Sequence, residues 1–140
     1  MIHVTVGLVV FIFWRDWVMQ IFEKILNDYK KSVSIGFHWT NEQEIIEQIH
    51  SELEEVKIEL QKGDKNALQD ELGDVLHAWA TLVDLCGVDL HETIELAGKK
   101  FEKRFAALEA VIAEENIRDF KNLSREQKLL FWKKAKQKSG

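Results

Sequence analysis

Two pairs of acidic residues stand three positions apart in the segment "HSELEEVKIELQKGDKNALQDELGDVLHAW", residues 50–79. Glu52 and Glu55 form the first pair, and Glu71 and Asp74 form the second. Residues three apart on a helix point in similar directions, so each pair forms one acidic edge. Close carboxylates repel each other unless a positive charge lies between them. Oxygen ligands without His or Cys suit Mg²⁺ or Mn²⁺, so the two pairs predict a site for a hard divalent cation.

The position of Gly63 between the pairs favours a shared site. Glu55 and Glu71 lie eight residues on either side of this glycine. If Gly63 ends one helix and a turn starts the next, the helices become antiparallel neighbours and the two edges face each other. The alternative is a set of ordinary surface charges, which is how we interpret Glu59.

Two neighbours of the second acidic pair also carry expectations. Gly73, between Glu71 and Asp74, would permit another backbone to approach closely. His77 follows Asp74 by one helical turn, so it is either a partner of a metal ligand or a histidine satisfied within the core.

Basic and aromatic residues downstream could hold a phosphate-bearing ligand. Lys100 and Arg104 are four residues apart, so both can reach one group of phosphate oxygens. Trp132 and Lys136 repeat that spacing, which would let an indole stack on a base while an ammonium group meets a phosphate. The alternatives are a basic helix face for the first pair, and a core tryptophan followed by a solvated tail for the second.

Helix signals predict an all-α protein, and the chain of 140 residues contains no proline. Capping patterns set most of the helix starts: Thr40 or Asn41 with Gln43 or Glu44, then Asp64, Asp89 with Glu92, and Ser124 with Gln127. The predicted helices cover about 19–31, 41–62, 65–86 and 90–112, and a fifth opens at 124. Short connections make an antiparallel bundle of about five helices.

We expect one helical domain over residues 19–140, preceded by an apolar extension of unknown role over residues 1–18. The apolar run at residues 4–14 is shorter than the ~20 residues that span a bilayer, so no membrane helix is expected. Its β-branched residues also permit a strand or a docking segment, and an alternative role is a tether to a membrane or a partner.

Charge and cysteine content narrow the function further. The net charge of -5 disfavours a nucleic-acid-binding surface. Cys86 is the only cysteine, so no intramolecular disulfide can form, and we expect a reducing, cytoplasmic location with Cys86 buried as a small apolar residue.

From "GFHW" at residue 36 to Lys136, the chain resembles the MazG-like all-α nucleoside triphosphate pyrophosphohydrolases. The family signature is E-x-x-E followed by E-x-x-D, and "SELEE" and "DELGDVLHAW" match it. "KFEKRF" looks like the family's phosphate-binding pair, and "FWKKAK" looks like its C-terminal Trp-x-x-x-Lys. Two positions depart from the family pattern: Ser51 stands where Glu is frequent, and Gly98 stands where Asn is frequent, which puts the substrate in question.

This resemblance implies metal-dependent hydrolysis of a nucleoside triphosphate between its α- and β-phosphates, as in the housecleaning of nucleotide pools. The four carboxylates would be the catalytic residues and ligands of Mg²⁺, with Mn²⁺ as an alternative. The substrate-binding residues would be Lys100, Arg104, Trp132 and Lys136. Alternatives are a related enzyme acting on dUTP or phosphoribosyl-ATP, and a non-catalytic metal-binding module. A homodimer or homotetramer is expected, while the preferred base is left open.

Overall fold

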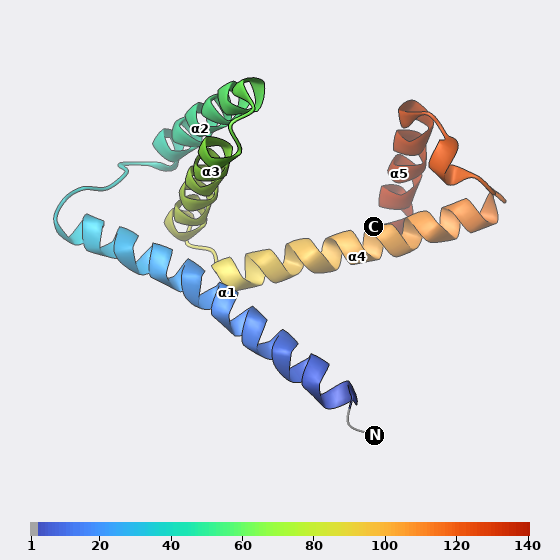
Figure 1. Cartoon of the computed structure of the whole chain (residues 1–140), viewed down its shortest axis with the longest axis horizontal. Helices are drawn as coiled ribbons and strands as arrows, with labels where there is room; N and C mark the ends of the chain where they lie inside the picture. Colours follow the sequence, from blue (N-terminus) through green and yellow to red (C-terminus); the bar gives the residue numbers. More distant parts are fainter. Residues whose placement is uncertain (1–2) are drawn as a thin grey trace. The chain divides into compact units, whose positions relative to one another are not determined.

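The computed structural model describes the backbone of residues 3–140 and the side chains from Trp17 onward. It contains α1 (His3–Ser34), α2 (Glu42–Lys62), α3 (Lys65–Leu85), α4 (Leu90–Glu114), the short 3₁₀ helix η1 (Phe120–Asn122) and α5 (Arg125–Ser139), as Figure 1 shows. No strand occurs among these described residues. The predicted all-α fold class with five α-helices is confirmed. The chain divides into two compact units at residues 91 and 92, and each unit is described by itself.

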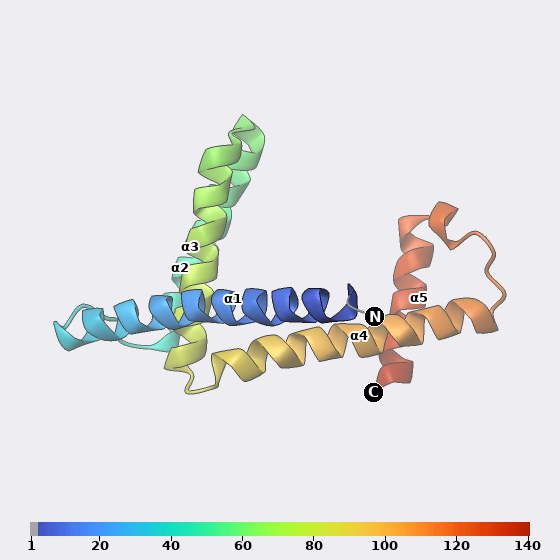
Figure 2. The same ribbon diagram turned by 60° about the horizontal axis from the view of Figure 1, so that its bottom comes forward.

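In the first unit, α2 and α3 form an antiparallel hairpin. The two helices lie side by side in both views of the chain (Figures 1 and 2). Gly63 ends α2 with a left-handed φ of 76°, and its amide donates to the Glu59 carbonyl at 2.9 Å. A side chain other than glycine is strained at this φ, so the residue type fixes the sharp reversal.

Side-chain caps set where the two helices of the hairpin begin. The Asn41 side chain accepts from the amide of Glu44 at 3.1 Å. One Asp64 carboxylate oxygen accepts from the amides of Asn66 at 3.0 Å and Ala67 at 3.1 Å. These caps satisfy amides that have no partner within the helix. The predicted ends of both helices are confirmed to within about one residue.

Helix α1 is longer than the sequence predicted. The backbone is helical from His3 to Ser34, so the strand that the sequence permitted at residues 4–14 is wrong, and the boundary at 18 and 19 falls inside a helix. The side chains of residues 1–16 lie outside the described part. Tyr29 is buried at 9% exposure, and Phe22 meets Trp79 of α3 edge to face with ring centroids 6.5 Å apart.

The second unit is built by α4 and α5. Its core consists of Leu108 and Val111 on α4 with Phe131 and Ala135 on α5. The predicted Ser124–Gln127 capping box opens α5: the Ser124 amide donates to Gln127 Oε1 at 2.9 Å, and the Gln127 amide donates to Ser124 Oγ at 3.2 Å.

The predicted burial of Cys86 is wrong. Cys86 is exposed, because it caps the C-terminus of α3 where the chain turns at Gly87, whose φ is 68°. A run of apolar residues does not show at which residue the helix leaves the core. None of the helices searched in the described part of the chain is long and apolar enough to cross a membrane.

Candidate functional site

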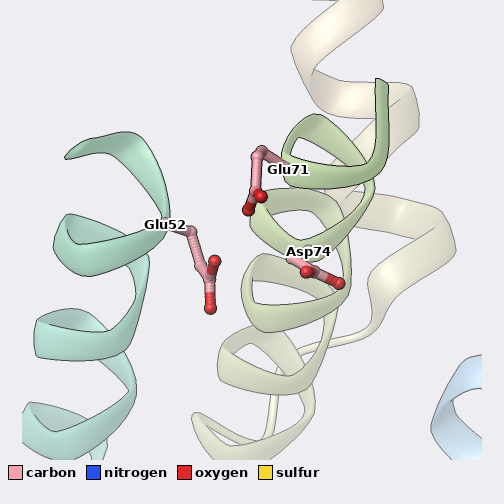
Figure 3. A group of neighbouring side chains, drawn as sticks. All are labelled: Glu52, Glu71 and Asp74. Atoms are coloured by element: carbon pink, nitrogen blue, oxygen red, sulfur yellow. The ribbon is translucent and has the colours of Figure 1, made fainter. Parts of the chain in front are cut away.

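The α2–α3 hairpin brings three of the four predicted carboxylates together. Oxygen atoms of Glu52, Glu71 and Asp74 all lie within 4.8 Å of one another. Figure 3 shows Glu52 extending from α2 toward α3, from which the other two project. Glu52 and Glu71 are partly buried, whereas Asp74 is exposed. We call these three residues the acidic cluster.

Glu55 lies outside the acidic cluster. Its side chain is exposed on α2, one turn beyond Glu52. The charge of Glu55 is nevertheless close enough to raise the pKa of Glu71. The structure therefore places Glu55 beside the cluster but not within it.

The electrostatics of the cluster are dominated by negative charge. The pKa of Glu71 is raised, first by desolvation and then by the carboxylates of Asp74, Glu55 and Glu52. Glu52 Oε1 accepts a hydrogen bond from Gln48 Nε2, which orients that carboxylate. Carboxylate oxygens gathered in this way fit a hard divalent cation by the chemistry of the donor set.

Glu59 corrects one expectation of solvated surface charge. Its side chain is buried, with the whole residue 8% exposed, and it forms an ion pair with Lys62 at 2.7 Å. The hydrogen bond from Lys62 to Glu59 raises the pKa of Lys62, as do the nearby carboxylates of Glu55 and Asp64. The ammonium group thus offsets part of the negative charge near the turn.

Two expectations about the neighbours of Asp74 are also corrected. A Cβ atom built on Gly73 meets no heavy atom of another part of the described chain within 4 Å, so no close backbone approach occurs there. His77 is exposed and lines a hollow, so it is not a core histidine. A glycine or a histidine in a helix pattern does not reveal which neighbour its face will meet.

The predicted substrate-binding residues all belong to the second unit. Lys100 and Lys136 are exposed, and Arg104 and Trp132 are partly buried. Trp132 packs on Phe101 with ring centroids 5.9 Å apart, which places α5 beside the segment of α4 that carries the basic pair. Three neighbouring lysines form ion pairs with described residues: Lys99 with Glu95, Lys134 with Glu115, and Lys138 with Glu114.

The sequence interpretation missed a hollow of about 340 Å³ in the first unit. The hollow is lined by Asp28, Tyr29, Ser32, Phe37, His38, Trp39 and His77. Its signal in the sequence is the aromatic and histidine cluster "GFHW", which we interpreted only as part of a loop.

Comparison with known proteins defines the family. The model of the MazG nucleotide pyrophosphohydrolase domain matches residues 40–108. The chain carries a MazG-like domain. The matched segment contains both acidic pairs together with Lys100 and Arg104, whereas Trp132 and Lys136 lie beyond it.

Two relatives of this chain carry names of nucleoside triphosphate pyrophosphohydrolases. A nucleoside triphosphate pyrophosphohydrolase of Escherichia coli (strain K12) is 30% identical over 86 residues, which is 60% of this chain and 33% of the relative. The nucleoside triphosphate pyrophosphohydrolase/pyrophosphatase MazG of Thermotoga maritima is 30% identical over 102 residues, 73% of this chain and 38% of the relative. The matched segments thus span 33% and 38% of the lengths of these two relatives.

Proposed function

We propose that this chain hydrolyses nucleoside triphosphates between the α- and β-phosphates and releases a nucleoside monophosphate and pyrophosphate. One observation carries the proposal: the acidic cluster forms on the α2–α3 hairpin, inside the segment that matches the MazG domain. The names of the relatives in Escherichia coli and Thermotoga maritima support this reaction class.

Glu52, Glu71 and Asp74, joined by Glu55, would hold Mg²⁺, or Mn²⁺ in its place. The bound cation would supply positive charge against the triphosphate and favour activation of water. The protein's own part is to hold the carboxylates on two helices fixed by a tight turn. Rigid positioning of this kind lowers the cost of organising the reacting groups.

The basic residues of the second unit would meet the phosphates. Lys100 and Arg104 stand one turn apart on α4, so both could donate hydrogen bonds to oxygens of one phosphate group. Lys136 on α5 would add a third cation, and Trp132 was expected from the sequence to contact the base. Charge that develops on the phosphates during hydrolysis would be stabilised by these donors.

Self-association is part of the proposal. Large apolar side chains are exposed on α2, α3 and α4, among them Leu60 at 60%, Leu72 at 51%, Phe101 at 58% and Phe105 at 46%. Exposed apolar residues in such numbers mark surfaces that a partner covers. We propose a homodimer or homotetramer; the cytoplasmic location stays a prediction from the lone cysteine.

Chromatography of the products tests the position of cleavage. Hydrolysis between the α- and β-phosphates yields a monophosphate and pyrophosphate in equal amounts. A diphosphate and inorganic phosphate would instead mean attack at the γ-phosphate and would overturn the proposal. Including dUTP and phosphoribosyl-ATP among the substrates separates the related pyrophosphohydrolases, a question raised by Gly98.

A further inference from the structure

The hollow of the first unit is enclosed by three segments of chain. The last turns of α1 contribute Asp28, Tyr29 and Ser32, the loop after α1 contributes residues 37–39, and α3 contributes His77. Its volume of about 340 Å³ falls within the range of small-molecule sites. Of its lining, only His77 lies within the segment that matches the MazG domain, so the hollow is largely built by residues outside that match.

The walls of the hollow suit a flat aromatic ring. Tyr29 is buried at 9% exposure and Trp39 is partly buried, while Phe37 is 80% exposed at the rim. Aromatic side chains bind bases by stacking on their faces, and every base has such a face. His38 Nδ1 donates to the Trp39 carbonyl at 2.8 Å, which orders the loop that carries the indole.

Polar groups around the aromatic walls can form hydrogen bonds with the edge of a bound ring. His38 and His77 each present a ring nitrogen, and Ser32 presents a hydroxyl whose proton is donated to the Tyr29 carbonyl at 2.7 Å. The serine oxygen therefore keeps a lone pair for a donor on a ligand. Burial raises the pKa of the Tyr29 hydroxyl, so this group stays protonated and can donate.

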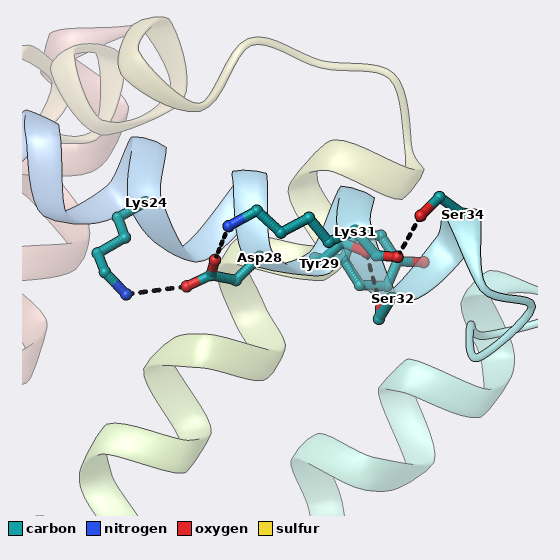
Figure 4. A network of polar contacts seen from close by, with 6 residues as sticks. All are labelled: Lys24, Asp28, Tyr29, Lys31, Ser32 and Ser34. Carbon is teal, nitrogen blue, oxygen red and sulfur yellow. Dashed lines mark hydrogen bonds and ion pairs between the residues drawn. The ribbon is translucent and has the colours of Figure 1, made fainter.

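The end of α1 that forms one wall is fixed by a polar network (Figure 4). Asp28 accepts from Lys24 at 2.9 Å and from Lys31 at 2.8 Å. No lysine or arginine is among the described residues that line the hollow, and Lys24 and Lys31 are already paired with Asp28. Phosphate groups are therefore disfavoured inside the hollow, and the neutral end of a nucleotide is favoured.

The hollow adjoins the acidic cluster along α3. His77 follows Asp74 by three residues, so the two side chains are neighbours on the helix surface. A nucleotide whose base occupies the hollow would direct its phosphates toward the carboxylates and the cation that they would hold. One ligand could thus span both features.

We propose that this hollow binds the nucleobase of the nucleotide, with Trp39 and Tyr29 as the stacking surfaces and His77 at the edge nearest the phosphates. The inference rests on the proposed function and assigns the base to the first unit. It differs from the expectation drawn from the sequence, in which Trp132, whose indole packs on Phe101, contacts the base.

Nucleoside binding by the full chain tests this assignment without metal or hydrolysis. Saturation-transfer NMR in EDTA would be recorded with adenosine, guanosine, cytidine, uridine and thymidine, each in turn. The variants are Trp39→Ala and His77→Ala, with His50→Ala, an exposed histidine of α2 outside the lining of the hollow, as the matched control. Circular dichroism checks that each variant stays helical, and the exposed His77 gives a second variant if Trp39→Ala loses structure.

We expect saturation of base protons for at least one nucleoside in the wild type. Loss of a stacking partner should weaken binding about 5- to 100-fold in Trp39→Ala. His77→Ala should also weaken it, and His50→Ala should leave it unchanged. Binding that survives both Trp39→Ala and His77→Ala, or no binding by any nucleoside, would overturn the assignment.

The result is separable from the fate of the proposed function. If the protein binds nucleosides through Trp39 but releases no pyrophosphate, only the hydrolase proposal is contradicted. If the protein releases pyrophosphate and its nucleoside binding is unchanged in Trp39→Ala and His77→Ala, only the base assignment is contradicted.

Discussion

Single side chains explain why the metal-free protein should gain stability from a cation. Glu52, Glu71 and Asp74 hold carboxylate oxygens within 4.8 Å of one another, and the pKa of Glu71 is raised by desolvation and by its acidic neighbours. Like charges at such separations repel, and a bound cation reverses the sign of that interaction. The folded hairpin presents these ligands together, so a cation should bind the native state in preference to the unfolded chain.

Mg²⁺ should therefore raise the melting temperature of the wild type. A cation at 100 times its Kd stabilises a folded protein by about 2.7 kcal/mol. Asp74→Ala removes a ligand, so its melting temperature should respond little to Mg²⁺. Asp70→Ala, at an exposed position on the same helix outside the cluster, should respond like the wild type. Thermal melts by circular dichroism with Mg²⁺ or EDTA give the comparison, and an unchanged response in Asp74→Ala would contradict the metal site.

Asp28 makes the stability of α1 depend on pH. The hydrogen bonds from Lys31 and Lys24 lower the pKa of Asp28 from 3.8 to about 2. Because the folded pKa lies below the unfolded value, the stabilisation is present above pH 3.8 and is lost as the pH falls through about 2. Asp28→Asn should therefore lower the melting temperature at pH 7 and leave it unchanged below pH 2. Glu23→Gln, on the same helix, is the control; equal effects of Asp28→Asn at both pH values would rule out this ion pair as the cause.

Residue types in the sequence predicted the acidic cluster but not its membership in detail. Two pairs spaced three apart around a glycine turn were enough to bring Glu52, Glu71 and Asp74 together. The position of Glu55 outside the cluster depends on the rotation of α2 about its axis, which packing sets and spacing does not. Exposure at Cys86 and burial at Glu59 were missed for the same reason, since both depend on where a helix face meets its neighbour.

Local hydrogen bonds set the helix ends, and the ends of α2 and α3 and the start of α5 are the features of the fold that the sequence predicted most accurately. Asn41, Asp64 and Ser124 cap their helices with side-chain oxygens that accept backbone amides within four residues. Such contacts need no tertiary partner, so a short stretch of sequence specifies them. The start of α1 carries no such signal: the helix lacks acidic residues in its first turn, and its apolar residues fit a strand pattern equally well.

Two glycines should respond in opposite ways to the same substitution. Gly98 lies inside α4 with no heavy atom within 4 Å of an added Cβ, so Gly98→Ala should stabilise the protein by about 1 kcal/mol. Gly63 has a φ of 76°, so Gly63→Ala should destabilise it. Urea unfolding measures both changes. A loss of stability in Gly98→Ala would contradict the open space around Gly98.

At the scale of the whole molecule, each of the two units leaves part of its apolar helix stripes exposed. Phe101 and Phe105 of α4 stack with ring centroids 6.0 Å apart, yet each is about half exposed. A periodic apolar stripe predicts that a face is covered, but not whether the cover is the same chain or a second one. The sequence therefore predicted five amphipathic helices without specifying the assembly.

The mass in solution tests that reading of the exposed apolar faces. Analytical ultracentrifugation of the wild type should give a multiple of the chain mass of 16.4 kDa. Phe105→Glu places a charge on the stacked aromatic pair and should shift the mass toward that of a single chain, because an unpaired charge is costly in an apolar interface. Lys103→Glu, an exposed charged position of the same helix, should leave the mass unchanged. A wild type that sediments as a single chain would contradict the oligomer.

The most direct test of the central claim is pyrophosphate release by the full chain. All common ribo- and deoxyribonucleoside triphosphates, with dUTP, would be offered with Mg²⁺, Mn²⁺ or EDTA, to the wild type and to Asp74→Ala, Glu55→Ala and the control Asp70→Ala. We expect release with a metal and none with EDTA, little or none from the first two variants although they stay helical, and unchanged release from the control. Release that persists in EDTA or in Asp74→Ala, or no release from any nucleotide, would contradict the hydrolase proposal.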